Sequence, residues 1–162
     1  MGVSGAGKTT LAAGLADALK VRFEEGDALH PRVNVEKMAA GQALSDEDRA
    51  PWLARIKEWI DTQLEHGQSG IIACSALKRA YRDTLRANRT NVIFIYIDGD
   101  EDLIRKRMSG RKGHFMPASL LASQFVALEP PANDEHAITV SAADPPQDQV
   151  RKAIAALNHR PP

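Results

Sequence analysis

Apolar and polar residues alternate along the chain with two different periods, and the change of period predicts strands interleaved with helices. Apolar residues recur at helical spacing in residues 8–20 and again in residues 45–67. Two short, continuous apolar runs, "GIIAC" at 70–74 and "NVIFIYI" at 91–97, have the length of buried strands. Such strands, separated by helices, are typical of a parallel sheet that helices cover on both faces.

Capping and turn residues predict where the elements begin and end. Ser45 and Asp48 form a capping pattern, and Gly67 ends the long helix that follows. Pro51 predicts that the main part of this helix starts near position 51. Further helices are expected at residues 32–40, 78–87, 100–109, 118–129 and 146–158. Further strands are expected in "VRFEEGD" at 21–27 and "AITVSA" at 137–142.

The length of the chain predicts one domain. A chain of 162 residues is near the usual size for a single hydrophobic core, so we expect one domain over residues 1–162. Residues 28–69 interrupt the regular alternation of strand and helix with a mostly helical insert. We expect this insert to shape a substrate pocket.

The composition excludes several classes of partner. Lys and Arg total 21 and Asp and Glu total 21, so the chain has no bulk positive field that would gather nucleic acid. The longest apolar runs are far shorter than the roughly 20 residues that span a bilayer. Cys74 is the only cysteine, which excludes an intramolecular disulfide. With no visible secretory signal, we expect a cytoplasmic protein without nucleic-acid or membrane partners.

The segment "GVSGAGKT" matches the phosphate-loop motif G-x-x-x-x-G-K-[ST] completely and leads into a predicted helix. Its glycines allow close backbone approach, so successive N–H groups can wrap the phosphates of a nucleotide. Lys8 supplies a cation for the β- and γ-phosphates, and the Thr9 hydroxyl can bind Mg²⁺. A glycine-rich turn with a chance lysine is the alternative, and the complete motif disfavours it. The residues expected to bind the nucleotide are Gly2, Val3, Ser4, Gly5, Ala6, Gly7, Lys8, Thr9 and Thr10.

A phosphate loop alone does not name the reaction, because switches, motors and kinases all use one. The guanine-specific pattern N-K-x-D is absent, which argues against a GTPase. Asp98 follows an apolar strand and could imitate the acid of a motor ATPase. Asp27 lies nearer the loop, at the expected carboxyl end of a strand, where it can orient or deprotonate a hydroxyl. A turn or N-cap role for Asp27 remains the alternative.

Four segments together resemble bacterial gluconokinases of the phosphate-loop type: "MGVSGAGKT", "EGDALHPRVNVEKMAAGQALSDEDRAPWL", "GIIACSALKRAYRDTLR" and "RKGHFMPASLLASQFVALEPP". The resemblance extends from Met1 to about Glu135. It implies an α/β, three-layer phosphate-loop kinase fold of the shikimate-kinase and nucleoside-monophosphate-kinase type, with a parallel sheet between helices. It also implies transfer of a phosphoryl group from MgATP to the terminal hydroxyl of D-gluconate, and a homodimer.

The resemblance implies roles for individual residues. Catalysis is expected from Lys8, Asp27 and Arg111, and ATP binding from Arg107 within a lid at about 107–117. Mg²⁺ is expected at Thr9 and, through a water, at Ser75. Gluconate is expected to contact Asp27, His30, Asn34, Lys37, Arg49 and Lys78. A solvated helix face is the alternative for the arginines. Trp52 can be core or pocket wall, and its helical spacing favours core.

One element of the expected fold is missing from the sequence. In the gluconokinases that the chain resembles, a hydrophobic strand precedes the phosphate loop and lies in the middle of the sheet, whereas here only Met1 precedes Gly2. Each backbone group that this leaves buried and unpaired costs about 1–3 kcal/mol. We therefore expect a sheet that lacks its first central strand, and a natural protein that supplies this strand upstream.

Two other functions remain open at this point. One is a kinase of the same fold with shikimate or a nucleotide as acceptor. The other is a truncated, non-catalytic ATP-binding protein, which would bind ATP but release no ADP when an acceptor is added.

Overall fold

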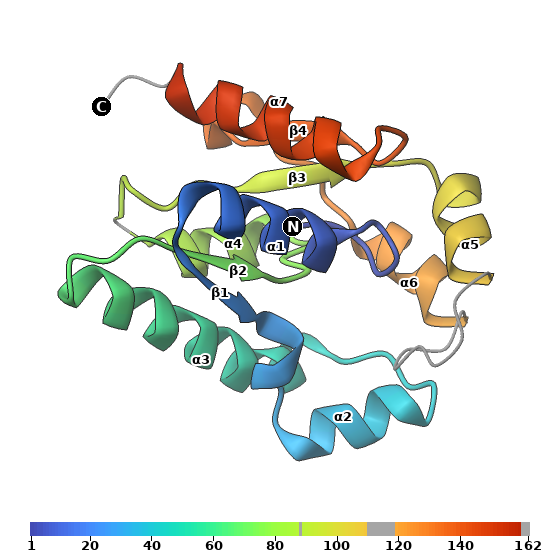
Figure 1. Ribbon diagram of the computed structural model, residues 1–162. Helices are drawn as coiled ribbons and strands as arrows, with labels where there is room; N and C mark the ends of the chain where they lie inside the picture. The colour runs from blue at the N-terminus through green and yellow to red at the C-terminus, as the bar shows by residue number, and fades with distance from the viewer. Residues whose placement is uncertain (88, 110–118, 160–162) are drawn as a thin grey trace.

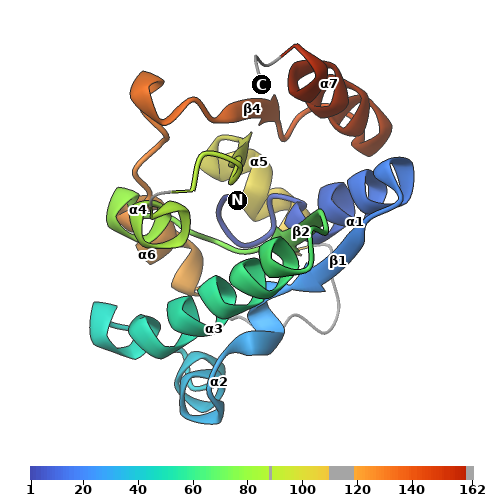
Figure 2. The ribbon, with the colours of Figure 1, turned by 90° about the vertical axis from the view of Figure 1, so that its left-hand side faces the viewer.

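The computed structural model describes residues 1–87, 89–109 and 119–159, which form parallel strands flanked by helices (Figures 1 and 2). Strand β1 (Arg22–Glu25) pairs with β2 (Gly70–Ala73), and strand β3 (Ile95–Asp98) pairs with β4 (Ile138–Ser141). Both pairs are parallel, with Arg22 opposite Gly70 and Ile95 opposite Ile138. The parallel α/β architecture expected from the alternation of strands and helices is thus confirmed.

Helices cover both faces of the strands. One face carries α1 (Lys8–Leu19) and α7 (Pro146–Asn158), which pack on each other and on β2 and β4. The other carries α3 (Asp46–Glu65) and α4 (Arg79–Arg86). The remaining helices are α2 (Arg32–Ala39), α5 (Glu101–Ser109), α6 (Ser119–Ala127) and the 3₁₀ turns η1 (Gly26–Leu29) and η2 (Asn133–Glu135). In the described part of the chain, no helix combines the length and apolar character needed to cross a bilayer.

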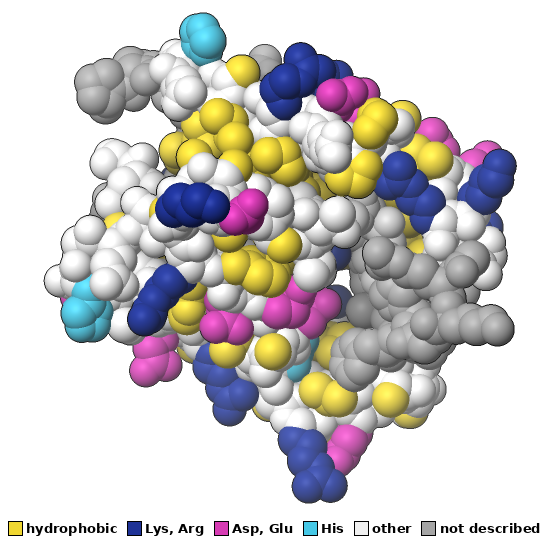
Figure 3. Space-filling view, viewed as in Figure 1, with side chains coloured by type: hydrophobic (Ala, Val, Ile, Leu, Met, Phe, Trp, Pro, Cys, Tyr) yellow, Lys and Arg dark blue, Asp and Glu magenta, His cyan; other side chains and the backbone are white. Residues whose placement is uncertain are grey.

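Apolar side chains form a core on each side of the strands. On the side of α1 and α7, the buried residues include Leu11, Leu15, Ile97, Val140 and Ala153. On the side of α3 and α4, they include Trp52, Ile56, Tyr81, Leu85 and Phe94. Some apolar side chains also reach the surface over α1 and along its border with α7 (Figure 3). Leu19, at the end of α1, is among them and is 41% exposed.

The start of α3 differs from the prediction based on Pro51. The helix begins at Asp46, five residues earlier, and Pro51 lies inside it. The Ser45 hydroxyl accepts a hydrogen bond from the Asp48 N–H at 3.2 Å, and the Asp48 carboxylate accepts one from the Ser45 N–H at 3.0 Å. This reciprocal cap and the acidic first turn stabilise the helix start. This stabilisation offsets the loss of the one backbone hydrogen bond that Pro51 cannot donate.

Met1 and Gly2 join the two strand pairs. The Met1 amino group donates to the Ile95 carbonyl, and the Met1 carbonyl accepts from the Ile97 N–H at 3.0 Å. On the other side, the Gly2 N–H donates to the carbonyl of Ser75, just beyond β2, at 3.1 Å. Among the described residues no strand precedes the phosphate loop, and these two residues stand where the expected central strand would end.

A cavity of about 370 Å³ extends from Met1 between the two strand pairs. Its lining is largely apolar and includes Leu11, Leu15, Ile60, Ile72, Val92 and Ile95. Because α1, α3, β2 and the segment entering β3 all contribute side chains, the cavity has the position of a strand between β2 and β3.

A strand-forming extension before Met1 should stabilise the fold. Five residues such as Val-Ile-Val-Leu-Val would fill the cavity and pair with β2 and β3. Backbone pairing and apolar burial together should raise the free energy of unfolding by about 3 kcal/mol or more. For a domain of this size that corresponds to about 6–12 °C in Tm, measured by calorimetry or circular dichroism. A Gly-Ser extension of equal length is the control, and equal Tm values for the two proteins would contradict the prediction.

Candidate active site

The phosphate loop presents backbone N–H groups to open space at the start of α1. Gly7 precedes the helix with φ +104°, and a side chain added there would meet nothing within 4 Å. Gly5 has φ +81° and lies against α5, where an added Cβ would come within 2.6 Å of Met108 Cγ. The first-turn N–H groups of a helix have no intrahelical acceptor. Together with the helix dipole they make this turn a binding site for phosphate.

Lys8 lies in a partly desolvated position. In this structure its Nζ donates to the Val3 carbonyl at 3.0 Å, inside the loop. Burial lowers the pKa of Lys8, and the nearby carboxylate of Asp27 opposes this shift. A cation with little surrounding water interacts strongly with an anion placed beside it. Lys8 is therefore suited to binding the phosphates that the loop amides surround.

Thr9 and Glu25 bring two oxygen ligands together at the edge of the loop. The Thr9 hydroxyl donates to Glu25 Oε2 at 2.6 Å. Glu25 ends β1, two positions before Asp27, and the sequence analysis did not assign it a role. Its position at the carboxyl end of a parallel strand was the available signal, because ligands of α/β sheets bind at that edge.

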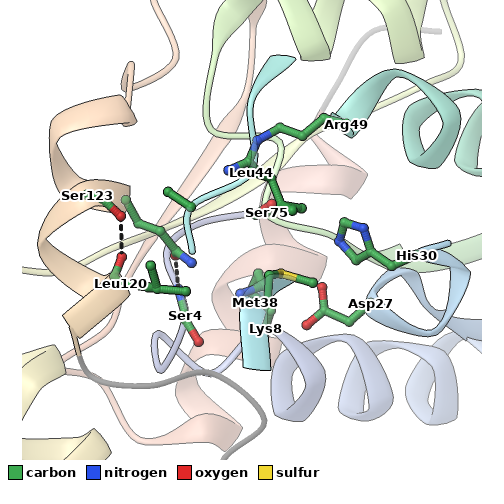
Figure 4. A pocket seen from close by; sticks show the side chains of 12 residues that line it. Ser4, Lys8, Asp27, His30, Met38, Leu44, Arg49, Ser75, Leu120 and Ser123 are labelled. Atoms are coloured by element: carbon green, nitrogen blue, oxygen red, sulfur yellow. Dashed lines mark hydrogen bonds between the residues drawn. The ribbon is translucent and has the colours of Figure 1, made fainter. Parts of the chain in front are cut away.

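A polar cavity adjoins the phosphate loop (Figure 4). The loop contributes Ser4 and Lys8, and Ser75 follows β2. Asp27 and His30 come from η1 and its end, and Arg49 comes from the first turn of α3. The structure thus brings together six residues that the sequence analysis expected in the site. The other lining residues are Met38, Ala43, Leu44, Leu120, Ser123 and Gln124.

Three expected gluconate ligands bond elsewhere and do not line this cavity. The buried Asn34 side chain donates from Nδ2 to the Asp48 carbonyl at 2.6 Å. Lys37 forms an ion pair with the Asp48 carboxylate at 2.7 Å. Lys78 donates to both carboxylate oxygens of Asp46, at 2.7 and 2.8 Å. These bonds attach α2 and the start of α4 to the first turn of α3.

His30 stacks flat on the buried Trp52. The ring centroids are 4.5 Å apart with an interplanar angle of 7°, and Trp52 is completely buried. The Trp52 indole donates to the Gly26 carbonyl at 2.7 Å, which ties α3 to the turn that carries Asp27. Burial lowers the pKa of His30 to about 4, although Asp27 acts in the opposite direction. His30 is thus a neutral hydrogen-bonding group, and the expectation that Trp52 belongs to the core agrees with its burial.

Gln124 connects α6 to the phosphate loop. Its Oε1 accepts a hydrogen bond from the Ser4 N–H at 2.7 Å, and both residues are buried. The sequence analysis missed this contact, although a glutamine within the apolar stretch "LLASQFVA" is an unusual choice for a packed helix. The bond holds α6 beside the loop, where Leu120, Ser123 and Gln124 form part of the cavity wall.

The expected lid lies only partly in the described residues. Arg107, at the end of α5, donates from Nη2 to the Ala142 carbonyl at 2.5 Å, beyond the end of β4. Arg111 and residues 110–117 of the expected lid lie outside the described residues. The expected ATP ligand Thr10 is exposed on the first turn of α1.

Several known proteins that resemble this chain in sequence and fold are kinases. Residues 4–156 match the shikimate kinase family. The chain is 52% identical over 154 residues to a gluconokinase of Gluconobacter oxydans, covering 95% of this chain and 86% of that one.

Solved structures of two bacterial kinases are also similar to this chain. A sugar kinase from Janibacter superposes with a TM-score of 0.93 at 48% identity, covering 98% of this chain and 91% of the other. A gluconokinase from Sinorhizobium meliloti superposes with a TM-score of 0.88 at 43% identity, covering 98% and 89%. Identity at this level extends the likeness beyond the fold to the whole sequence.

The neutral state of His30 predicts a loss of stability in acid. In the unfolded chain the imidazole binds a proton near its ordinary pKa of 6.5, and in the folded chain near 4. Between these values the unfolded state binds more protons, so acidification favours unfolding. From pH 7 to pH 4.5, the stability advantage of the parent over a His30→Gln variant should fall by about 1–2 kcal/mol, measured by denaturant titration. An advantage that stays constant with pH would contradict the prediction.

Proposed function

The chain belongs to the gluconokinase family and to the wider shikimate kinase family, and from this premise we propose that it phosphorylates D-gluconate with ATP. The γ-phosphoryl group goes to the terminal hydroxyl, which gives 6-phospho-D-gluconate and ADP. The observation that carries the proposal is that the phosphate loop, which would bind ATP, also forms a wall of the cavity that would bind gluconate. Ser4 and Lys8 belong to the phosphate loop and also line the cavity that contains Asp27 and Arg49.

The phosphate loop would hold the donor. Its amides and the N-terminus of α1 bind the phosphates, and Lys8 stabilises the negative charge that develops on the transferred group. From the family resemblance, Arg107 contacts the nucleotide and Arg111 neutralises charge on the phosphoryl group.

Asp27 would orient the acceptor. Its carboxylate accepts a hydrogen bond from the terminal hydroxyl and takes its proton as the oxygen attacks phosphorus. The new O–P bond forms on the side of the γ-phosphorus away from ADP, and the bond to the β-phosphate oxygen breaks. Asp27 and Lys8 line the same cavity, which supports this arrangement.

Arg49 would bind the carboxylate of gluconate. Lys37 and Lys78 are already paired with Asp48 and Asp46. Arg49 has no ion-pair partner among the described residues and lines the cavity. A guanidinium can donate two parallel hydrogen bonds to a carboxylate. Neutral His30 and the Ser75 hydroxyl would bond the hydroxyl groups between the two ends of the acceptor.

The oxygen ligands at the edge of the loop fit Mg²⁺. The hydroxyl of Thr9 and the carboxylate of Glu25 are hard donors 2.6 Å apart. Among the described residues, no group of three or more His, Cys, Asp and Glu side chains could hold a metal ion. Mg²⁺ bound with a nucleotide takes most of its ligands from phosphates and water. When bound, the ion neutralises phosphate charge. Thr9 would hold it directly, and Ser75 and Glu25 through water.

Acceptor entry would separate α6 from the insert. In this structure the cavity measures about 40 Å³, room for a few water molecules rather than a six-carbon acid. Met38, Leu44 and Leu120 pack together along one side of it. Parting this small apolar cluster would widen the cavity. From the family resemblance we also propose that the enzyme is a cytoplasmic homodimer.

An Asp27→Asn variant tests the proposed reaction. The parent should release ADP when gluconate is added and much less with shikimate, AMP or CMP. The variant cannot take the hydroxyl proton, so its kcat should fall by about 10²–10⁴ with little change in the KM for ATP. Asp17→Asn, an exposed carboxylate on α1, is the control and should keep the parent's kcat. Absence of gluconate-dependent ADP release by the parent would refute the function.

An Arg49→Ala variant tests the assignment of the carboxylate site. Losing a charge-assisted bond of about 1.5–3 kcal/mol should raise the KM for gluconate by about 10- to 100-fold. The KM for ATP should stay within about threefold, because Arg49 does not belong to the phosphate loop. Arg55→Ala removes an exposed arginine of the same helix and is the matched control. An equal rise in both variants would remove Arg49 from the carboxylate site.

A further inference from the structure

The guanidinium of Arg49 lies over the ring of Tyr81. Its central carbon is 5.8 Å from the ring centroid, within the range of a cation–π interaction. Tyr81 belongs to α4, is 6% exposed and does not line the cavity. The contact therefore connects a cavity residue of α3 to a buried residue of another helix.

The Tyr81 ring is fixed from both ends. Its hydroxyl donates to the Asp46 carboxylate in the first turn of α3. Its other atoms pack in the core formed with Trp52 and Ile56. A ring restrained in this way presents one face in a constant direction. A long, flexible arginine side chain that rests on this face loses less entropy when a ligand binds.

Asp46 is the acidic neighbour that could draw Arg49 away from the cavity. Its carboxylate already accepts a hydrogen bond from the Tyr81 hydroxyl. It also accepts two from the Lys78 ammonium, at 2.7 and 2.8 Å. These bonds lower the pKa of Asp46, that of Lys78 contributing most. No ion pair of the described residues includes Arg49. With Asp46 occupied, the guanidinium keeps its hydrogen-bond donors for a ligand.

We propose that Tyr81 is a positioning residue that holds the Arg49 guanidinium toward the cavity and thereby sets the affinity for the acceptor's carboxylate. The inference rests on the proposed function, since it needs an anionic acceptor at Arg49. It assigns the role to the face of the ring that Arg49 contacts. The Lys78 ammonium also lies near this ring, 5.7 Å from its centroid, and is paired with the Asp46 carboxylate.

The test compares Tyr81→Leu with Tyr81→Phe. Leucine removes the ring face, so the KM for gluconate should rise by about 3- to 10-fold, as expected for a lost cation–π contact. The kcat and the KM for ATP should stay within about twofold, because the phosphate loop and Asp27 are untouched. Phenylalanine keeps the ring and should keep the KM for gluconate within about twofold of the parent.

Phe94→Leu is the matched control. Phe94 lies in the same core, is 7% exposed, and carries the Arg86 guanidinium at 5.2 Å from its centroid. Neither residue lines the polar cavity beside the phosphate loop, whereas Phe94 borders the apolar cavity near Met1. The substitution should lower Tm, as Tyr81→Leu should, and leave the KM for gluconate unchanged. KM does not depend on the fraction of folded enzyme, so a purely structural effect of Tyr81 would not raise it.

Each outcome decides the inference. A selective rise of the gluconate KM in Tyr81→Leu alone supports it. It is overturned if that KM stays within twofold, if the KM for ATP rises equally, or if Phe94→Leu shows the same rise. A parent enzyme without gluconate-dependent ADP release overturns the proposed function and this inference together, whereas an active parent with an unchanged Tyr81→Leu variant overturns the inference alone.

Discussion

The backbone contacts of Met1 and Gly2 hold the two halves of the structure together, and the position of the phosphate loop depends on them. Met1 bonds to Ile95 and Ile97 on one side, and Gly2 bonds to Ser75 on the other. These bonds act together with the Ser4–Gln124 bond and the packing of α1 on β2 and α7 to fix the loop relative to Asp27 and Arg107. An apolar cavity adjoins this junction and extends from Met1 between the two strand pairs.

The first turn of α3 organises the acceptor side in a similar way. Asp48 forms an ion pair with Lys37, and Asp46 forms one with Lys78. The Asn34 side chain donates a hydrogen bond to the Asp48 carbonyl. Each bond attaches a neighbouring helix to this turn. The two ion pairs also engage Lys37 and Lys78, which could otherwise bind an anion in the cavity. Arg49, on the same turn, is left directed toward the cavity beside neutral His30. Structural ion pairs thus decide which cation is available to a ligand.

Localised charges explain how a chain with no net charge could bind the two anions of the proposed reaction. Burial removes water from Lys8 and lowers its pKa, while the Asp27 carboxylate opposes this shift. A cation with little surrounding water is attracted strongly to phosphate. Arg49 supplies the second positive group at the other end of the cavity. Two localised cations replace the general positive field that the composition lacks.

The sequence by itself determined the local features. The spacing of glycines, Lys8 and Thr9 specified the phosphate loop, and the periods of apolar residues specified the strands and helices, because both depend on neighbours within a few positions. The start of α3 was predicted wrongly from Pro51, since the reciprocal bond of Ser45 and Asp48 outweighs one missing donor. Only the tertiary structure decided which polar residues share the cavity. Lys37, Lys78 and Arg49 are equivalent cations in the sequence. In the fold, carboxylates of α3 pair with Lys37 and Lys78, and Arg49 has no ion-pair partner among the described residues. Gln124 and Glu25 entered the site for the same reason, because their partners Ser4 and Thr9 are distant in the chain and adjacent only in the fold.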